Sequence, residues 1–307
     1  MRTFGRHVLS RPGTLAAYVF AAVLLLLAVV GPAVAPYDPT QADIGNRLAA
    51  PSAEHWFGTD STGLDVFSRV ICAPRTDLAI AVIGVLVSMG LGVALGLVSG
   101  YAETGLGGVV SAVILRVTEM IQSFPVFVLA MALVASSGQK MTNVIYAVAF
   151  VNVPFYLRMV HTESRVLRRR AFVESARVSG VRPPRIVARH ILPNALTPAL
   201  AQMSVNFGWA ILLTAGLSFA GAGVRMPTPE WGLMIAQGVQ DTNSGAWWTA
   251  VFPGVALTAT VACFALVGRS LEEALGTGGS GAADSSPRAG AAGRRSIRAR
   301  AGWGARL

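Results

Sequence analysis

The chain has 307 residues, of which 53% are hydrophobic and only 13% are charged. Soluble domains carry about 25% charged residues, so this composition excludes a soluble enzyme of this size. The net charge is +10, but the basic residues flank apolar blocks and form no soluble patch, which argues against nucleic-acid binding. The two cysteines, Cys72 and Cys263, lack metal-site spacing, and no disulfide is expected.

Long apolar blocks follow one another along the chain, and most are long enough to cross a bilayer core of about 30 Å as helices. The expected spans are 14–35, 78–100, 108–136, 141–160, 196–221 and 248–267. The predicted fold class is therefore all-α, a polytopic membrane protein with six transmembrane helices. Span 14–35 has some features of a signal peptide, but its apolar core exceeds the usual length of about 7–15 residues, which favours an uncleaved anchor.

The distribution of charge predicts the orientation of the spans. Residues 36–77 contain six acids and three bases, which is typical of an extracytoplasmic segment, whereas residues 158–190 contain nine arginines and two acids, a strong cytoplasmic marker. The basic N-terminus 1–13 and an even number of spans place both termini in the cytoplasm. The tail 276–307 is rich in Gly, Ala, Ser and Arg, and we expect it to be disordered and basic.

Several residues inside the spans carry local predictions. A stripe of small residues would let a neighbouring helix approach closely. The stripe consists of Gly92, Gly96 and Gly100. Arg116 and Glu119, three residues apart, predict a structural intramembrane ion pair near the cytoplasmic interface. Pro125 should kink the span 108–136. Candidates to face a cavity, with no orientation assigned, are Phe127, Met131, Asn152 and Asn206.

The cytoplasmic loop 162–190 contains the most informative pattern. Residues 171–179 predict a short helix, which Gly180 is suited to end in a left-handed cap. Pro183 and Pro184 are tolerated in the first turn of a second helix that leads into the next span. The apolar face expected on the first helix consists of Phe172, Val173 and Ala176. Physical reasoning alone leaves two roles open: a docking element for a partner protein, or an interfacial helix lying on lipid.

The pattern Glu174-x-Ala176-x-x-x-Gly180, followed by His-Ile-Leu-Pro-Asn, resembles the cytoplasmic loop signature of permease subunits in ABC importers. In that family the segment is a coupling helix seated in a groove of the ATP-binding subunit. The resemblance implies that the segment 170–186 contacts an ATPase subunit. The coupling residues that it implies are Phe172, Glu174, Ser175, Ala176, Gly180, Arg182 and Arg185. Ser175 stands where the family usually has Ala.

Further motifs resemble the external segments of dipeptide/oligopeptide permeases, and best match the second, six-span permease of the pair. The motif residues on the external face are Gly58, Asp60, Asp65, Pro229, Glu230, Trp231 and Gly232. The resemblance covers residues 12–275 and implies a five-helix permease core over 78–275, with the fold of a type I ABC importer transmembrane domain. Departures from the usual pattern occur at Leu64, Pro74 and His161.

The resemblance also implies the partners: a second permease in a heterodimer, cytoplasmic ATPase subunits and an extracytoplasmic peptide-binding protein, in a bacterial plasma membrane. The chain contains no Gly-x-x-x-x-Gly-Lys-Ser/Thr, so we expect no bound cofactor and no enzymatic activity, with ATP and Mg held by the ATPase subunits. Three alternatives stay open. They are the same machine importing nickel or another small solute, a proton-driven secondary transporter, and a membrane scaffold. The secondary transporter would need acids at mid-span, where Glu119 is the only clear one and has a partner in Arg116.

Overall fold

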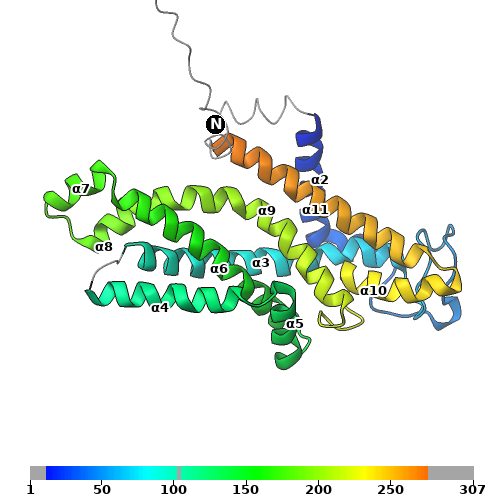
Figure 1. Cartoon of the computed structure of the whole chain (residues 1–307). Coiled ribbons are helices and arrows are strands. Elements are labelled where there is room, and N and C mark those ends of the chain that lie inside the picture. Colours follow the sequence, from blue (N-terminus) through cyan, green and yellow to red (C-terminus); the bar gives the residue numbers. More distant parts are fainter. Residues whose placement is uncertain (1–11, 102–104, 276–307) are drawn as a thin grey trace, which may run out of the picture.

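The computed structural model describes residues 12–101 and 105–275 (Figure 1). Within these ranges the regular structure is helical, apart from one isolated bridge between Thr59 and Asp65, which confirms the all-α prediction. The predicted basic tail 276–307 and nearly all of the predicted N-terminal segment 1–13 lie outside the described residues.

Six helices of the described chain are long and apolar enough to cross a membrane, as predicted. They are α2 (Pro12–Val34), α3 (Val66–Tyr101), α4 (Gly105–Gln122), α6 (Met141–Arg168), the continuous helix Pro183–Phe219, and α11 (Trp248–Leu275). The continuous helix consists of α8 (Pro183–Ile186), the π-helical turn η2 (Val187–Ile191) and α9 (Leu192–Phe219).

The helix α3 begins at Val66, well before the span start that the sequence predicted at Leu78. The first turn of α3 starts after Asp65, whose carboxylate accepts a hydrogen bond from the Ser68 backbone N–H at 2.7 Å, the geometry of an N-cap. The last part of the predicted extracytoplasmic segment 36–77 is therefore helical. Sequence reasoning missed this because polar residues interrupt the apolar pattern there, although most of them are buried against other parts of the chain.

The predicted kinked span 108–136 is instead two helices, α4 and α5 (Val126–Ser137). Pro125 has an extended conformation, with ψ of 123°, and immediately precedes α5. A proline has no N–H and disfavours the helical conformation in the residue before it, so the chain leaves the helix at Ser123 and turns sharply. Pro125 thus breaks this segment, where the sequence predicted a kink.

The helices α3 and α6 form the most extensive helix pair, and the glycine stripe lies in their contact. A β-carbon added at Gly92 would lie only 2.5 Å from Cβ of Tyr156, and one added at Gly100 would lie 2.7 Å from the carbonyl oxygen of His161. Only a residue without a side chain fits at these positions. The prediction of close helix approach is therefore confirmed.

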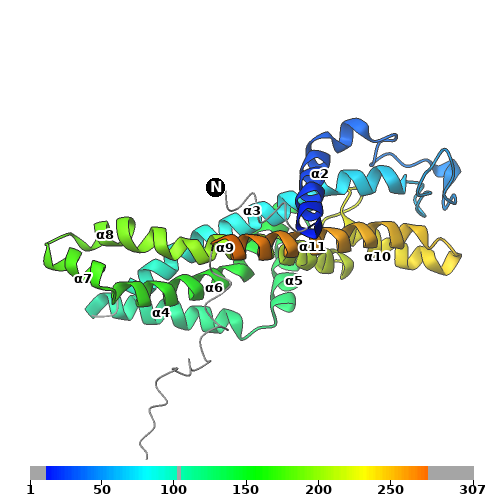
Figure 2. The same ribbon diagram turned by 90° about the horizontal axis from the view of Figure 1, so that it is seen from above.

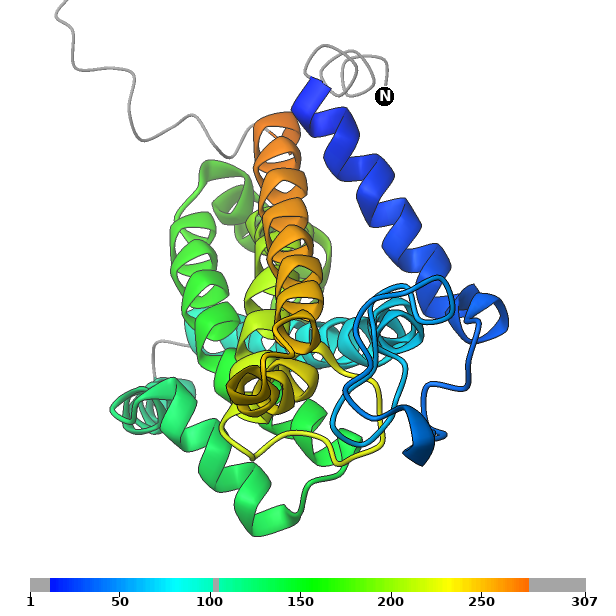
Figure 3. The same ribbon diagram turned by 90° about the vertical axis from the view of Figure 1, so that its right-hand side faces the viewer.

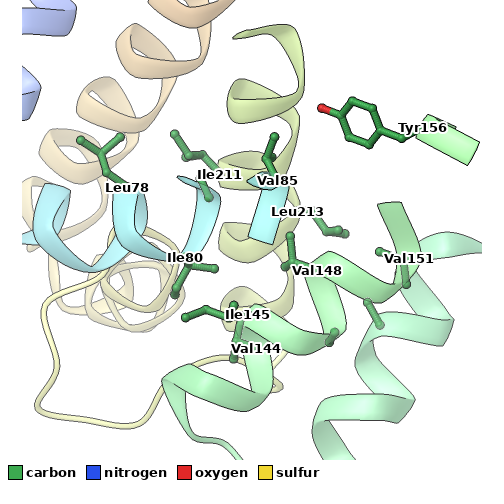
Figure 4. Packing of buried hydrophobic residues seen from close by; sticks show 14 of the residues in the cluster. Leu78, Ile80, Val85, Val144, Ile145, Val148, Val151, Tyr156, Ile211 and Leu213 are labelled. Atoms are coloured by element: carbon green, nitrogen blue, oxygen red, sulfur yellow. The ribbon is translucent and has the colours of Figure 1, made fainter. Parts of the chain in front are cut away.

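The central hydrophobic cluster joins α3, α6 and α9 (Figure 4). Its residues drawn there include Ile80 and Val85 of α3, Val144, Ile145 and Val148 of α6, and Ile211 and Leu213 of α9. The helix α2 lies at the margin of this core and packs on α3 and α11 (Figure 3). Most of its side chains are exposed, as expected of a helix that faces lipid.

Two groups of short helices occupy opposite ends of the long axis, as Figures 1 and 2 both show. One end, here called the α7 end, carries α7 (Ala171–Val178) and α8. The other, the α10 end, carries α10 (Trp231–Asp241), the turn η3 (Thr242–Ser244), and the segment 36–65 with the turn η1 (Ile44–Asn46). The helical bundle therefore separates the predicted coupling loop from the predicted external motifs.

Candidate coupling segment, external motifs and central cavity

The helix α7 ends in the cap that the sequence predicted. Gly180 has φ of +74°, its N–H donates to the Arg177 carbonyl at 3.0 Å, and the Val181 N–H donates to the Ala176 carbonyl at 3.1 Å. These two bonds form a Schellman motif, which satisfies the last carbonyl groups of a short helix. The chain then reverses and begins α8.

The two faces of α7 differ from the predicted apolar face. Val173 is fully buried and Ala176 is partly buried, but Phe172 is 44% exposed and Val178 is 84% exposed. Glu174 and Ser175 are also exposed. The apolar face predicted from the sequence is therefore divided, with Val173 and Ala176 anchoring α7 and Phe172 presented outward.

The helix α8 continues the same surface. Pro183 and Pro184 occupy its first turn, as expected, and Ile186 is buried beneath it. Arg182 and Arg185 are both exposed. The π-helical turn η2 follows and feeds directly into α9, so a displacement of α8 has a continuous helical connection to the membrane core.

A basic hollow of about 590 Å³ lies beside α7. Its lining residues are Tyr101, Arg168, Arg169, Glu174 and Arg177. Arg168 donates to the Tyr101 carbonyl at 3.0 Å, which ties the end of α3 to the end of α6. Glu174 is therefore the acidic residue of a hollow that is otherwise lined by arginines and one tyrosine, next to the exposed surface of α7.

The motif residues at the α10 end are largely buried, and they hold the segment 36–65 in place. The Asp60 carboxylate accepts hydrogen bonds from the N–H groups of Thr62 and Leu64 at 2.8 and 2.9 Å. The Asp65 carboxylate contacts the imidazole of His55 at 2.9 Å, in addition to capping α3. These carboxylates close loops and organise the backbone of this segment.

Gly58 lies where the segment 36–65 meets α11. Its φ is +71°, and an added β-carbon would lie 2.5 Å from the Ala49 carbonyl oxygen and 2.6 Å from Nε1 of Trp248. The Trp248 indole N–H donates to the Thr59 carbonyl at 3.1 Å. The glycine is therefore required for the close approach of the tryptophan.

Glu230 and Trp231 connect α10 to the rest of the bundle. Glu230 is fully buried, and its two carboxyl oxygens accept from the N–H groups of Gly232 and Leu233 at 2.8 and 2.7 Å, capping α10. Burial raises the pKa of this carboxyl above its ordinary value. A β-carbon on Gly232 would lie 2.4 Å from Cα of Ala215, so α10 rests directly on α9.

The departure at Pro74 has a structural partner in Trp231. Because Pro74 lies inside α3 and has no N–H, it offers no hydrogen bond to the carbonyl of Val70, one turn earlier. That carbonyl accepts the Trp231 indole N–H at 3.2 Å. Of the other two departures, the Leu64 side chain is buried, and the imidazole of His161 contacts the Ser99 hydroxyl at 3.0 Å between α6 and α3.

The position of Asp77 also differs from the prediction. The sequence placed it at the end of an external segment and left Glu119 as the only clear acid within an apolar span. In the structure Asp77 is buried within α3, and its carboxylate accepts the Trp231 backbone N–H at 3.3 Å. A buried acid was missed because its partner comes from α10, far away in the sequence.

Arg116 and Glu119 form the predicted pair, with Arg116 Nη1 3.1 Å from Glu119 Oε2. Both side chains are exposed on the outside of α4. They lie in the second half of α4, whereas the end of that helix that follows α3 is at the α7 end (Figure 1). The pair thus lies past the middle of α4, and its location near the cytoplasmic interface stays a prediction.

A cavity of about 400 Å³ lies between α4, α5, α6 and α9. It is lined by Ile121, Gln122, Val126, Leu129, Val151, Asn152, Phe155, Val205, Asn206 and Trp209. Two of the cavity candidates, Asn152 and Asn206, line it. Phe127 and Met131 are not among its lining residues, and the Phe127 ring instead lies against Gly216 on α9.

Comparison with known families explains this arrangement of loop, bundle and external motifs. Residues 92–277 match the family model described as "Binding-protein-dependent transport system inner membrane component". The chain belongs to this family. Residues 1–51 also match the model described as "N-terminal TM domain of oligopeptide transport permease C". The protein is thus a multi-pass membrane permease of the ABC importer type, a transport subunit, and its family works with ATPase and substrate-binding partners.

Curated relatives of this permease cover most of its length. A probable D,D-dipeptide transport system permease protein, DdpC of Escherichia coli (strain K12), is 36% identical over 86% of this chain and 87% of the relative. The dipeptide transport system permease protein DppC of Alkalihalophilus pseudofirmus is 38% identical over 82% of this chain and 81% of the relative. The glutathione transport system permease protein GsiD of Pectobacterium atrosepticum is 37% identical over 89% of this chain and 90% of the relative.

A solved structure shares the fold of the permease. It is described as an inward-facing conformation of the MetNI methionine ABC transporter, with a TM-score of 0.56 and 17% identity, over 67% of this chain and 96% of that chain. At this identity the likeness bears on the fold alone, and it agrees with the predicted transmembrane domain of an ABC importer.

Three features of the permease escaped sequence reasoning. Val178 was not assigned to the exposed surface, although its position three residues after Ser175 places both on one face of a helix. The buried position of Asp77 and the walls of the central cavity depend on contacts between distant segments.

The seven predicted coupling residues lie along the continuous α7–α8 segment, and the predicted external residues gather at the α10 end.

Proposed function

We propose that this permease imports dipeptides or oligopeptides that a substrate-binding protein delivers, in a bacterial plasma membrane, with energy from ATP hydrolysed by partner subunits. The names of the relatives, which are dipeptide and glutathione permeases, support a peptide cargo. ATP and Mg bind the ATPase subunits, and this chain carries out the mechanical part of transport by alternating between conformations with different contacts.

The observation that carries the proposal is the exposed outer surface of α7. Phe172 and Val178 present apolar side chains, with Glu174 and Ser175 between them in sequence, on a helix that Val173 fixes to the core. An exposed apolar pair with a single acid is suited to a groove in a partner protein. ATPase closure would move α7, and α8 and η2 would pass the movement to α9.

The orientation that we propose rests on the distribution of charge. The arginine-rich residues 158–190 lie at the α7 end, so the positive-inside rule places that end in the cytoplasm. With six spans, both termini are then cytoplasmic and the α10 end faces the binding protein. A second permease completes the pathway as a heterodimer, and its presence accounts for the apolar residues that α4 and α5 expose.

The test uses the full complex of both permeases, the ATPase subunits and the binding protein in liposomes. In Glu174→Lys, we expect ATPase co-purification and ATP-driven dipeptide uptake to fall by tenfold or more, since loss of an interface charge contact costs about 2–5 kcal/mol. Val178→Ser should lower the same two quantities by removing an apolar contact. Membrane insertion should stay normal, because both side chains are exposed in the chain alone.

Glu54→Lys is the matched control for ATPase co-purification, since Glu54 is also exposed but lies at the α10 end. Normal co-purification and uptake in both α7 variants would refute the coupling role. Solute transport by the purified chain alone, without ATP or partners, would instead identify a secondary transporter.

A further inference from the structure

Among the residues that the structure describes, those lining the central cavity are all uncharged. Its polar residues are Gln122, Asn152 and Asn206, all of them carboxamides, and the others are aliphatic or aromatic. The two charged residues of α4, Arg116 and Glu119, pair with each other outside the set of lining residues. The volume of about 400 Å³ is within the range of small-molecule sites.

The cavity lies at mid-height of the bundle. Asn206 is half-way along α9, and Asn152 is near the middle of α6. The break at Pro125 exposes the end of α4 and the start of α5 to the same space, which adds Gln122 and Val126 to its wall. Burying a polar group at this position costs free energy unless the group is hydrogen-bonded, and burying an amide costs less than burying a charge.

Asn206 has unused hydrogen-bonding capacity. It is 6% exposed, and its amide nitrogen completes no hydrogen bond of standard geometry among the described residues, although the Tyr156 hydroxyl lies beside it. Asn152 differs, because its amide nitrogen donates to the Val148 carbonyl at 2.8 Å. A buried donor without a well-placed acceptor is unfavourable, so the Asn206 amide N–H is available to donate to the carbonyl group of a ligand.

We propose that this cavity is the permease's peptide-contact site, in which Asn206, Asn152 and Gln122 bind peptide amide groups and the rings of Phe155 and Trp209 cover side chains. The inference rests on the proposed peptide-import function and adds its selectivity. A carboxamide donates and accepts, as a peptide bond does, and pairs with it irrespective of the residues it joins. Because the wall carries no charge, it does not distinguish peptides by the charge of their side chains.

The experiment introduces one charge into the cavity and compares two dipeptides, one containing lysine and one containing glutamate. The liposome complex carries Asn206→Asp, a change that removes no hydrogen bond of standard geometry made by that amide nitrogen among the described residues. Gln122→Glu is a second variant at an exposed position of the cavity wall, in case the first disturbs folding. Gln240→Glu, an identical change at an exposed position of α10 that is absent from the cavity wall, is the matched control.

The measured quantity is the ratio of lysine-peptide to glutamate-peptide uptake, divided by the same ratio for the wild type. Because both complexes use the same binding protein, any preference of that protein for one peptide cancels. We expect both cavity variants to raise it about tenfold, because a new negative charge attracts one peptide and repels the other. Gln240→Glu should leave the ratio unchanged. An unchanged ratio in both cavity variants, with ATP-driven uptake intact, would overturn the site but not the import function. The absence of ATP-driven peptide uptake in the wild type would overturn both.

Discussion

Replacing Gly96 by alanine adds a methyl group at the contact between α3 and α6. The new β-carbon would lie 2.8 Å from the Leu157 carbonyl oxygen, 2.8 Å from Cβ of Val160 and 3.1 Å from the His161 backbone nitrogen. These atoms belong to the backbone or are β-carbons, so no side-chain rotation relieves the overlap. The two helices must separate instead. Gly90, on the same helix, has no atom of the described chain within 4 Å of an added β-carbon and is the matched control.

The expected magnitude follows from two opposing effects. Overpacking a tight contact costs about 1–3 kcal/mol. Alanine is favoured over glycine inside a helix by about 1 kcal/mol, and this gain applies to both variants. The free energies of unfolding should therefore differ by about 1–3 kcal/mol between Gly90→Ala and Gly96→Ala. With about 2–4 °C per kcal/mol, the melting temperatures should differ by roughly 2–12 °C.

The assay is thermal unfolding in detergent, followed with a thiol-reactive fluorophore. Cys72 and Cys263 are both buried, so their thiols become reactive as the bundle opens. Gly96→Ala should melt below the wild type or close to it, and clearly below Gly90→Ala. Equal melting temperatures for the two alanine variants would refute the reasoning, because they would show that α3 and α6 do not meet at the glycine stripe.

Three further outcomes are expected. Asp65→Asn weakens the cap of α3 and the contact with His55, and should lower the melting temperature by about 2–4 °C in the same assay, since a cap is worth about 1 kcal/mol. Burial raises the pKa of Glu230, and a raised pKa contributes stability at pH values below the ordinary 4.5 that is lost as the pH rises through the folded-state value. The melting temperature should therefore fall as the pH rises from 4.5, and Glu230→Gln should flatten this dependence in a pH series. Gly180→Ala places a β-carbon at φ of +74°, at a cost of about 1–2 kcal/mol, and should weaken ATPase co-purification while the chain stays inserted.

Much of the fold was predictable because its signals are local. A membrane span needs about 20 apolar residues whatever it packs against, so six spans follow from composition along the chain. The cap at Gly180 and the helix start at Pro183 also depend on neighbouring residues alone. The glycine stripe on α3 was predictable since its spacing places all three glycines on one face.

Helix boundaries with polar residues were less predictable. The first turns of α3 contain charged side chains, such as Arg69 and Asp77, that are typical of a loop in water. In the structure they are buried, with Arg69 donating to the Pro227 carbonyl at 3.3 Å and Asp77 bound to Trp231. These partners lie more than 150 residues away, and no local pattern announces them.

By itself, the sequence determined that this chain is a six-span membrane protein with a capped helix in its basic loop, because hydropathy, charge and turn chemistry act over short distances. The tertiary structure alone decided that Val178 is exposed while Val173 is buried, that Arg116 and Glu119 are exposed on the outside of α4, and that Asn152 and Asn206 share a cavity. Each of these depends on the direction in which a helix face points once other helices cover it. Packing between distant segments sets that direction.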